Sequence, residues 1–518
     1  MTLTLILPPD AAADTRTSLT VGIVASKTLE LYPLKLRERD MVSMMNLVYE
    51  GLFYLDDDEY PQPDLCESYE WAGDGKRLDI RLRQNVTFHN GKKLTAEDVC
   101  ATLDMMLALS GFDDNRDSEI DPAERGLYAS CLTYISSWNW SESDPYTVQI
   151  VPRYPSYEVF YALTFPILPA EEVDLPQPSG TGPYKIEEYD PGYRLWISSY
   201  SGWWQRAPQI VDIEAIIYED TDGVLSAFEY QDVDVTMTRS ISATRYSGSL
   251  NSYMLTYRTR QLEVLFMNLG RTLFQNQDVR TAICMALDRD AIIKSVYQNM
   301  AISANSLVMS GTWLYEEDAA QPLYNPTAAK ALLDGAGYKL VDKGDGSPIY
   351  RYKNGDPEQP LSFRLLTYDE PGSTVRRNAA ANIKSMLAEV GIKVSVEVWS
   401  YDNVKAKLKS GDYWMVLGAY NLDVIPDPSF MLNSAVYGAA YSRYRDETMV
   451  GYLKDLRSAK DADAFQKVMS DIQNKFVVDL PFIAMYWRTG ALLSRDSFTN
   501  ARDIRELELL RGVEEWYY

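Results

Sequence analysis

The sequence contains very little histidine or cysteine. His89 is the only histidine in 518 residues, and the four cysteines, Cys66, Cys100, Cys131 and Cys284, form no Cys-x-x-Cys pair. Zinc sites use histidine and cysteine ligands at close spacing, so we expect no such metal centre and no cofactor. A Ser-His-Asp triad would have to use His89, and no Gly-x-Ser-x-Gly segment is present to carry the serine. Whether any cysteines pair stays open.

Basic residues and long apolar runs are also scarce. There are 50 lysines and arginines against 74 acidic residues, which gives a net charge of −24. Nucleic acid binding requires a basic surface, so the sequence argues against that function. No apolar run reaches the roughly 18 residues of a membrane span. With 46% apolar residues over 518 positions, the composition is that of a globular protein with two or three domains.

His89 lies in the stretch VTFHNGKKLTAEDVCATLDMM, residues 86–106. Residues 77–82 before it alternate charged and apolar side chains, which is the period of a half-buried strand. Asn90-Gly91 is a turn dipeptide, and the segment TAED that follows has the pattern of a helix cap. The stretch therefore predicts a strand, a turn and a helix, with His89 as part of the turn rather than as a catalyst.

Strand and helix patterns alternate between residues 361 and 423. Strand patterns at 361–368, 392–399 and 413–420 are separated by helix patterns at 373–391 and 401–411. This alternation predicts parallel βαβ units, in which ligands bind beyond the carboxyl ends of the strands. Those ends carry aromatic and acidic side chains, namely Tyr368-Asp369, Trp399-Ser400-Tyr401 and Tyr420-Asn421-Leu422-Asp423. We interpret them as a binding wall; the alternative is that Trp399 and Tyr420 only pack beneath loops.

Another helix pattern occupies residues 276–297. Its apolar side chains recur at the spacing of one helix face, at Val279, Ala282, Ile283, Ala286 and Leu287. The spacing predicts an amphipathic helix over this segment.

Several ordered segments resemble one known family. FHNGKKLTAEDV (88–99) is similar to the signature of the family 5 solute-binding proteins of ABC importers, the oligopeptide-, dipeptide- and nickel-binding group. Further segments resemble family blocks in the family order, and together they extend over nearly the whole chain: LVYEGLFYLD (47–56), GTGPYKIEEYDPG (180–192), NQDVRTAICMALDRDAI (276–292), PDPSFML (426–432) and LPFIAMYWRTGALLS (480–494).

The resemblance implies an α/β fold with two lobes, of the periplasmic-binding-protein type (type II, cluster C-like), closing on ligand by a hinge. An additional α/β domain packs beside one lobe. Mapped onto this sequence, the first lobe combines residues 1–45, 156–261 and 488–518. The additional domain is 46–155 and carries the His89 stretch, and the second lobe is 262–487.

The implied function is capture of a solute outside the cytoplasm, most readily a short peptide, for delivery to the permease subunits of an ABC importer. The same fold could bind a sugar, an opine or a metal chelate, or act as a peptide-sensing receptor. A secreted hydrolase with paired carboxylates is a remote alternative, so we expect no enzyme. The family also implies a monomer in the periplasm, or at the cell surface on a lipid anchor, with the targeting segment absent from this sequence.

One site residue comes from the family pattern. Peptide binders of the family hold the ligand ammonium with the Asp of an A-D-Y-x-[DE]-P segment, and Asp423 occupies the equivalent place after its strand. Here the segment reads NLDVIPDP, with Asp423 one residue further from Pro428; counting from the proline gives Val424 instead. If Asp423 is the anchor, its loss weakens an amine-bearing ligand by about 2–5 kcal/mol. The candidate ligand-binding residues are Asp423, Tyr420, Asn421, Trp399, Tyr401, Tyr368 and Tyr32.

Overall fold

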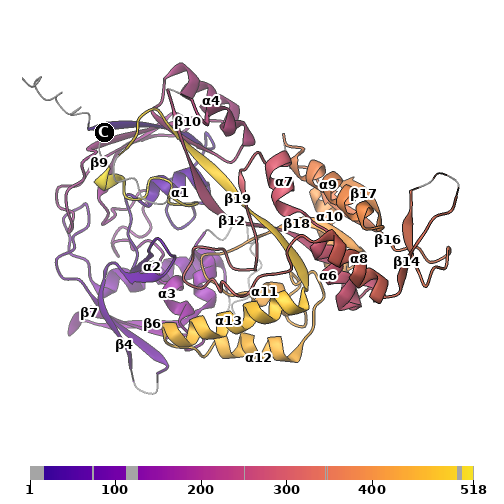
Figure 1. Ribbon diagram of the computed structural model, residues 1–518. Coiled ribbons are helices and arrows are strands. Elements are labelled where there is room, and N and C mark those ends of the chain that lie inside the picture. Colours follow the sequence, from indigo (N-terminus) through magenta and orange to yellow (C-terminus); the bar gives the residue numbers. More distant parts are fainter. Residues whose placement is uncertain are drawn as a thin grey trace, which may run out of the picture.

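Two long strands, β12 (Tyr253–Met267) and β19 (Phe482–Ser494), organise the protein. The computed structural model describes residues 17–72, 75–112, 127–249, 251–344, 346, 348–370, 372–498 and 504–516, and these strands are central in its 11-stranded mixed sheet. Their antiparallel pairing shifts register between Arg258 and Leu262 and again between Glu263 and Val264. Figure 1 shows β12 and β19 running diagonally from one half of the molecule to the other.

The first half of the sheet lies on one side of these register shifts. There the C-terminal half of β19 pairs with β11, and the sheet continues through β1, β10, β9 and β8. β1 is parallel to both β10 and β11, whereas β9 and β8 are antiparallel to their neighbours. The elements are β1 (Ser18–Val24), α1 (Arg39–Met45), β8 (Tyr184–Asp190), β9 (Arg194–Ser199), β10 (Asp212–Tyr218), α4 (Thr221–Tyr230) and β11 (Val235–Thr238).

The second half of the sheet confirms the predicted parallel βαβ units. β16 (Ser362–Tyr368) pairs in parallel with β17 (Lys393–Trp399) and with β18 (Met415–Asn421), and β18 pairs with β12. α9 (Val375–Glu389) ends before Gly391, whose φ of 87° is the left-handed conformation that glycine adopts without strain.

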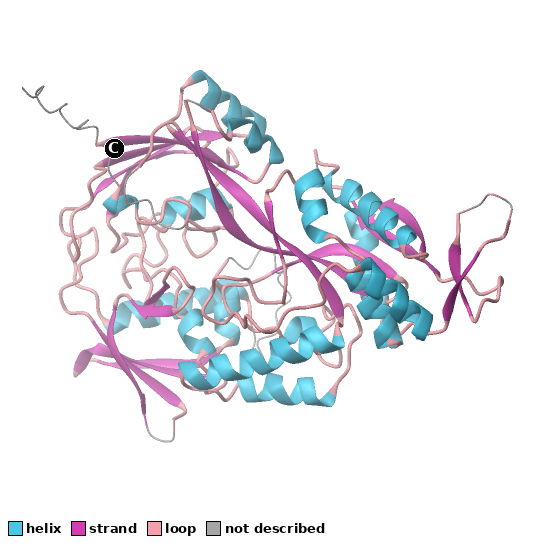
Figure 2. Ribbon diagram, in the orientation of Figure 1, coloured by secondary structure: helices cyan, strands magenta, loops and turns pink. Residues whose placement is uncertain are grey.

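Helices cover both faces of this half. Alternate β18 residues join two different cores: Met415 packs in one core with Ile383 of α9, whereas Val416 packs in the other with Val404 of α10 (Tyr401–Ser410). Figure 2 shows helices on either side of these strands. The other elements of this half are α5 (Thr272–Gln275), α6 (Gln277–Met285), α7 (Arg289–Val296), β13 (Ala301–Ser303), α8 (Pro326–Gly335), β14 (Tyr338–Val341) and β15 (Tyr350–Lys353).

The amphipathic helix predicted over residues 276–297 is two helices, so that prediction was wrong in its extent. α6 ends at Met285 and α7 begins at Arg289. The Asp288 side chain accepts a hydrogen bond from the Ala291 N–H and caps α7, which starts a new helix where the apolar spacing alone suggested continuity.

A separate antiparallel sheet, in the order β4-β5-β7-β6, lies within the predicted additional domain. The Thr95 N–H donates to the Asp98 carboxylate at 2.8 Å at the start of α2, which confirms the predicted cap. The elements are β2 (Phe53–Leu55), β3 (Pro61–Pro63), β4 (Cys66–Ala72), β5 (Arg77–Leu82), α2 (Ala96–Ser110), β6 (Ile135–Ser141), β7 (Asp144–Pro152) and α3 (Glu158–Ala162).

Helices from late in the chain pack against α3. The Tyr157 N–H donates to the Ala459 carbonyl at 2.7 Å, and the Ser156 hydroxyl donates to the Leu456 carbonyl at 2.9 Å. Figure 1 shows α12 (Glu447–Leu456) and α13 (Ala462–Asp479) beside α3, after the short α11 (Ser429–Leu432). These hydrogen bonds connect the segment before α3 to the end of α12 and the residues just after it, which precede β19 in the chain.

The predicted boundaries at 261/262 and 487/488 fall where β12 and β19 shift register, because Leu262 pairs with Trp487 there. The division into lobes and an additional domain stays a prediction. All four cysteines are free and buried. Within the described part of the chain, no helix combines the length and the apolar character that a membrane crossing requires.

Candidate functional site

A pocket lies where several distant segments meet. Arg260 of β12 and Trp487 of β19 line it from the two central strands, and Glu59 and Tyr161 reach it from the β2–β3 turn and from α3. The volume of the cavity is about 90 Å³. This is enough for several water molecules or for one ligand group of the size of a side chain. The rest of the lining is mostly apolar: Leu307, Val308, Met309, Thr312, Trp313, Leu314, Leu422, Asp423, Val424, Ile425, Pro426, Asp427, Pro428, Phe430, Met431 and Met469.

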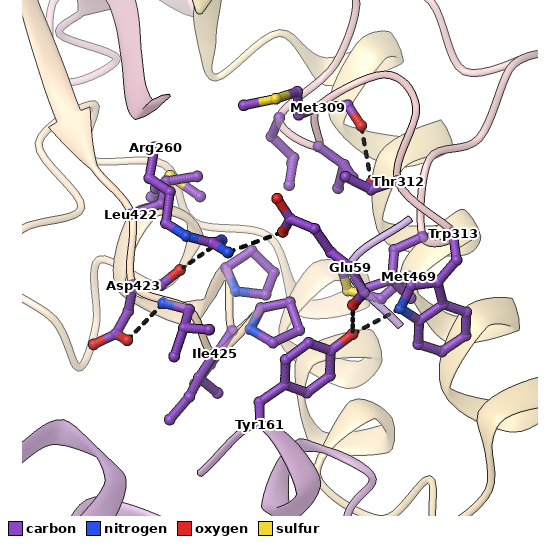
Figure 3. Close-up of a pocket in the computed structure, with 18 of the residues that line it drawn as sticks. Glu59, Tyr161, Arg260, Met309, Thr312, Trp313, Leu422, Asp423, Ile425 and Met469 are labelled. Carbon is purple, nitrogen blue, oxygen red and sulfur yellow. Dashed lines mark hydrogen bonds and ion pairs between the residues drawn. The ribbon is translucent and has the colours of Figure 1, made fainter. Parts of the chain in front are cut away.

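An ion pair crosses one wall of the pocket. Nη2 of Arg260 lies 3.1 Å from Oε2 of Glu59. The Arg260 side chain is 21% exposed and the Glu59 side chain is 16% exposed. Arg260 also donates through Nη1 to the Asp423 backbone carbonyl at 3.4 Å, and Figure 3 shows its guanidinium between the two acceptors. Burial alone raises the pKa of the Glu59 carboxyl, but Arg260, Arg505 and Arg258 outweigh it and bring that pKa below its usual range. Glu59 is therefore a carboxylate at neutral pH.

The backbone of Glu59 is held in an unusual conformation. Its φ is 62°, in the left-handed region that non-glycine residues seldom adopt. The Tyr161 hydroxyl donates to the Glu59 carbonyl at 3.2 Å, and the Trp313 indole N–H donates to that hydroxyl at 2.7 Å (Figure 3). These two bonds tie the β2–β3 turn to α3 and to the loop after β13, so the surroundings fix Glu59 at the pocket wall.

Asp423 lines the pocket, but its side chain is exposed. Its Oδ1 accepts a hydrogen bond from the next backbone N–H, that of Val424, at 2.6 Å. Figure 3 shows the Asp423 carboxylate turned away from the Glu59 carboxylate. In this conformation Asp423 contributes its backbone carbonyl to the Arg260 contact.

Two further acidic side chains lie close together, Asp427 in the pocket lining and Glu158 near it. Asp427 accepts from the Tyr134 hydroxyl at 3.3 Å and lies 3.5 Å from the Arg457 guanidinium. Glu158 is 1% exposed, and neither of its carboxyl oxygens has a hydrogen-bond partner in the described part of the chain. Burial raises the pKa of Glu158 well above its usual range, and the nearby Asp427 raises it further. Glu158 is therefore neutral at neutral pH.

The structure brings Tyr368, Trp399 and Tyr401 together, as their shared strand edge predicts. Tyr368 pairs with Trp399 in the sheet, and the Tyr368 and Tyr401 rings are 5.0 Å apart. The Arg376 guanidinium lies 4.2 Å from the Tyr368 ring centre and forms a 2.5 Å contact with Glu263, both side chains being buried. The Tyr368 ring therefore lies over a buried ion pair, and none of the three residues is in the lining of the pocket described above.

The remaining candidates lie apart from the pocket. Tyr420 is 4% exposed, packs edge-on against Phe266 at 5.0 Å, and donates its hydroxyl to the Ala439 carbonyl. Asn421 is exposed at the end of β18. Tyr32 is buried, and its hydroxyl donates to a backbone carbonyl of the segment before β8.

Sequence reasoning missed Glu59, Tyr161, Arg260 and Trp487. The sequence could have pointed only to Arg260 and Trp487, because both lie on β12 and β19, the strands that cross between the lobes. Trp487 is 2% exposed, and its indole N–H has no acceptor among the described residues. No group of three or more His, Cys, Asp and Glu residues in the described segments is arranged to hold a metal ion.

The prediction that His89 belongs to a turn is confirmed. Its Nδ1 accepts from the Gly180 N–H at 3.3 Å, which leaves Nε2 to donate to the Gly182 carbonyl at 3.0 Å. Burial, together with the charge of the nearby Lys185, lowers the pKa of His89 to about 4, so the imidazole is neutral. His89 thus links its own turn to the segment that leads into β8, and it is not in the lining of the pocket described above.

Comparison with known proteins gives a family. Residues 60–442 match the family described as bacterial extracellular solute-binding proteins, family 5 Middle. The oligopeptide-binding protein AppA of Bacillus subtilis is 23% identical over 516 residues, covering 96% of this chain and 91% of that protein. The dipeptide-binding protein of Escherichia coli is 24% identical over 436 residues, covering 77% and 76%.

A solved structure described as a nickel ABC transporter from Bacillus halodurans superposes with a TM-score of 0.80 at 21% identity, covering 95% of this chain and 98% of that one. The fold is thus the two-lobed α/β fold of periplasmic binding proteins. Since the family match extends over most of the sequence, this chain belongs to the family 5 bacterial extracellular solute-binding proteins.

Proposed function

We propose that this chain captures a short peptide between its two lobes and delivers it to the permease subunits of an ABC importer. The observation that carries the proposal is the composition of the pocket. Its walls come from the β2–β3 turn and α3, from both central strands, from residues 307–314 and from the 422–431 segment, which the predicted boundaries assign to different lobes and to the additional domain. A ligand in this pocket contacts all of these parts at once, so its binding energy favours the arrangement that brings them together.

The central strands supply the hinge of this proposal. β12 and β19 are the strands that join the two halves of the sheet, and both register shifts lie at the crossing, beside Arg260 and Trp487. Interrupted pairing gives the strands local freedom to bend, whereas the flanking ladders stay intact. Closure about this point moves the lobes as rigid bodies around the ligand.

The chemistry of the lining favours a peptide. Most of the wall is apolar, which suits amino-acid side chains, and the Glu59–Arg260 pair offers one acceptor and one donor for charged ligand groups. The two curated relatives named above bind oligopeptides and dipeptides according to their names. Asp423 stays a candidate contact because it lines the pocket.

A metal chelate is the second candidate, favoured by the structural match to a nickel transporter protein. The described residues contain no arrangement of ligands for a bare metal ion. A metal would therefore enter already wrapped in a small chelator, whose organic surface the apolar wall would contact.

We further propose that the chain is a binding protein without catalytic activity, monomeric, and located outside the cytoplasm, with a lipid anchor as one means of attachment. The neutral and hydrogen-bonded state of His89 supports the absence of histidine-based catalysis.

Thermal unfolding of ligand-stripped protein tests the peptide proposal. Pools of di- to pentapeptides, a sugar panel and a nickel–histidine complex are added separately. A ligand present at 100 times its Kd stabilises the folded state by about 2.7 kcal/mol, which raises the unfolding midpoint measurably. We expect this rise with the peptide pools alone; a rise with only the nickel complex would establish the second candidate instead.

A further inference from the structure

We infer that Glu59, in the β2–β3 turn of the additional domain, is the carboxylate that binds the ammonium group of the ligand, and that Arg260 is its displaceable partner. The inference deepens the proposed function and rests on it. It names the ligand class as peptides with a free amino terminus and an apolar side chain next to it.

The position of the two acidic groups supports Glu59 over Asp423. The Asp423 side chain is exposed, hydrogen-bonded to its own neighbour, and turned away from Glu59 (Figure 3). Glu59 is only 16% exposed and lies at the wall of an otherwise apolar pocket. An ammonium beside Glu59 meets a carboxylate of low exposure, where charge attraction is screened less than at the surface.

The backbone of Glu59 provides a second, independent observation. The φ of Glu59 lies in the left-handed region, a conformation that favours glycine and that a glutamate adopts only with strain. The structure holds the strained residue in place through the Tyr161 hydroxyl and the Trp313 indole. Two side chains of the pocket lining thus hold the backbone of Glu59 in place at this wall.

The Glu59–Arg260 pair also shows how the ligand is exchanged. Oε2 of Glu59 lies 3.1 Å from Nη2 of Arg260. The ligand ammonium donates to the carboxylate, and the guanidinium that it displaces keeps the Asp423 carbonyl as an acceptor and gains a carboxylate oxygen of the ligand. The charges balance in both states, so no buried charge is left without a partner.

The apolar wall sets the side chain that follows the ammonium. Met309, Ile425, Met431 and Met469 line the cavity, and methionine side chains adapt to apolar groups of different shape. The pocket therefore accepts apolar first residues of several shapes.

The test compares two peptide pools, identical except that one is N-acetylated, by calorimetry on ligand-stripped protein. We expect the unmodified protein to prefer the free pool by at least about thirtyfold in Kd, the effect of removing one partner from a low-exposure charge pair. Glu59→Gln keeps a hydrogen-bond acceptor for Arg260 but removes the charge, so the preference should fall to within about threefold. Asp58→Asn is the matched control: it removes the same charge from an exposed residue of the same turn that does not line the pocket, and should keep the full preference.

The outcomes separate the two proposals. Equal affinity of the unmodified protein for both pools overturns the inference while peptide binding stands, and this comparison requires no variant to fold. An unchanged preference in Glu59→Gln, or its loss in Asp58→Asn, also overturns it. If neither pool binds, the peptide function itself fails and the inference fails with it.

Discussion

The environment of His89 predicts a lowered pKa, and this pKa can be measured directly because His89 is the only histidine in the sequence. Its Nδ1 accepts a hydrogen bond from the Gly180 N–H, so protonation of that nitrogen breaks the contact. The pKa falls from 6.5 to about 4 in the folded protein, whereas the unfolded chain keeps the ordinary value. Between these two pH values the unfolded chain binds the proton and the folded chain does not.

The sign and the size of the effect follow from that difference. A depressed histidine pKa means that its contribution to stability is complete above pH 6.5 and is lost as the pH falls towards 4. The difference of pKa corresponds to about 3 kcal/mol of unfolding free energy. Glu50 works in the opposite sense: burial raises its pKa to about 7, so its contribution is complete below pH 4.5 and is lost as the pH rises through 7. The total stability of the protein therefore does not isolate His89.

Two measurements isolate it. Because the chain has a single histidine, selective ¹³C labelling of histidine gives one NMR signal that needs no assignment, and its titration reports the folded pKa directly. Denaturant unfolding of the unmodified protein and of His89→Gln at several pH values gives the second measure. The stability difference between the two should shrink by about 3 kcal/mol from pH 7 to pH 4. A midpoint near 6.5, or a pH-independent difference, would refute the account of His89 as a buried, neutral imidazole.

Three other substitutions probe the described contacts. Asp423→Ala should weaken an amine-bearing peptide by about 1 kcal/mol or less, below the range expected from sequence, because its carboxylate is exposed; calorimetry giving a loss of several kcal/mol would make it the main anchor. Tyr420→Ala should lower the free energy of unfolding by about 3–5 kcal/mol, since it empties a packed core position; a stable variant with impaired binding would place Tyr420 in the site instead. Glu263→Gln should cost about 3–5 kcal/mol in denaturant unfolding because it leaves the buried Arg376 charge poorly paired; a change under 1 kcal/mol would show the network to be dispensable.

Local patterns predicted the strands and helices of the second lobe well. Between residues 361 and 423 each strand is short and either mostly apolar or alternating, and each helix has its own cap or terminal glycine, so every element is specified within its own sequence. The segment 276–297 shows where such reasoning fails. Its apolar period continues across the break, and only the capping contact of Asp288 shows that a second helix begins.

The site was less accessible to sequence reasoning because it is assembled from segments far apart in the chain. Tyr420 and Asp423 are three residues apart at one strand end, yet one lies in the core and the other at the pocket. β18 is buried on both faces, so its sequence shows no alternation to tell which side chains face a cavity. Glu59 had no recognisable signal, since a turn of several acidic residues is most often solvated surface.

The measurement that tests the central claim most directly is native mass spectrometry of the purified protein, followed by denaturing extraction of what it carries. The account predicts bound masses that resolve into short peptides with free amino termini and apolar first residues, lost together when the lobes unfold. A single non-peptide small molecule, or protein that stays bare after incubation with peptide pools, would contradict the claim that this chain captures peptides between its lobes.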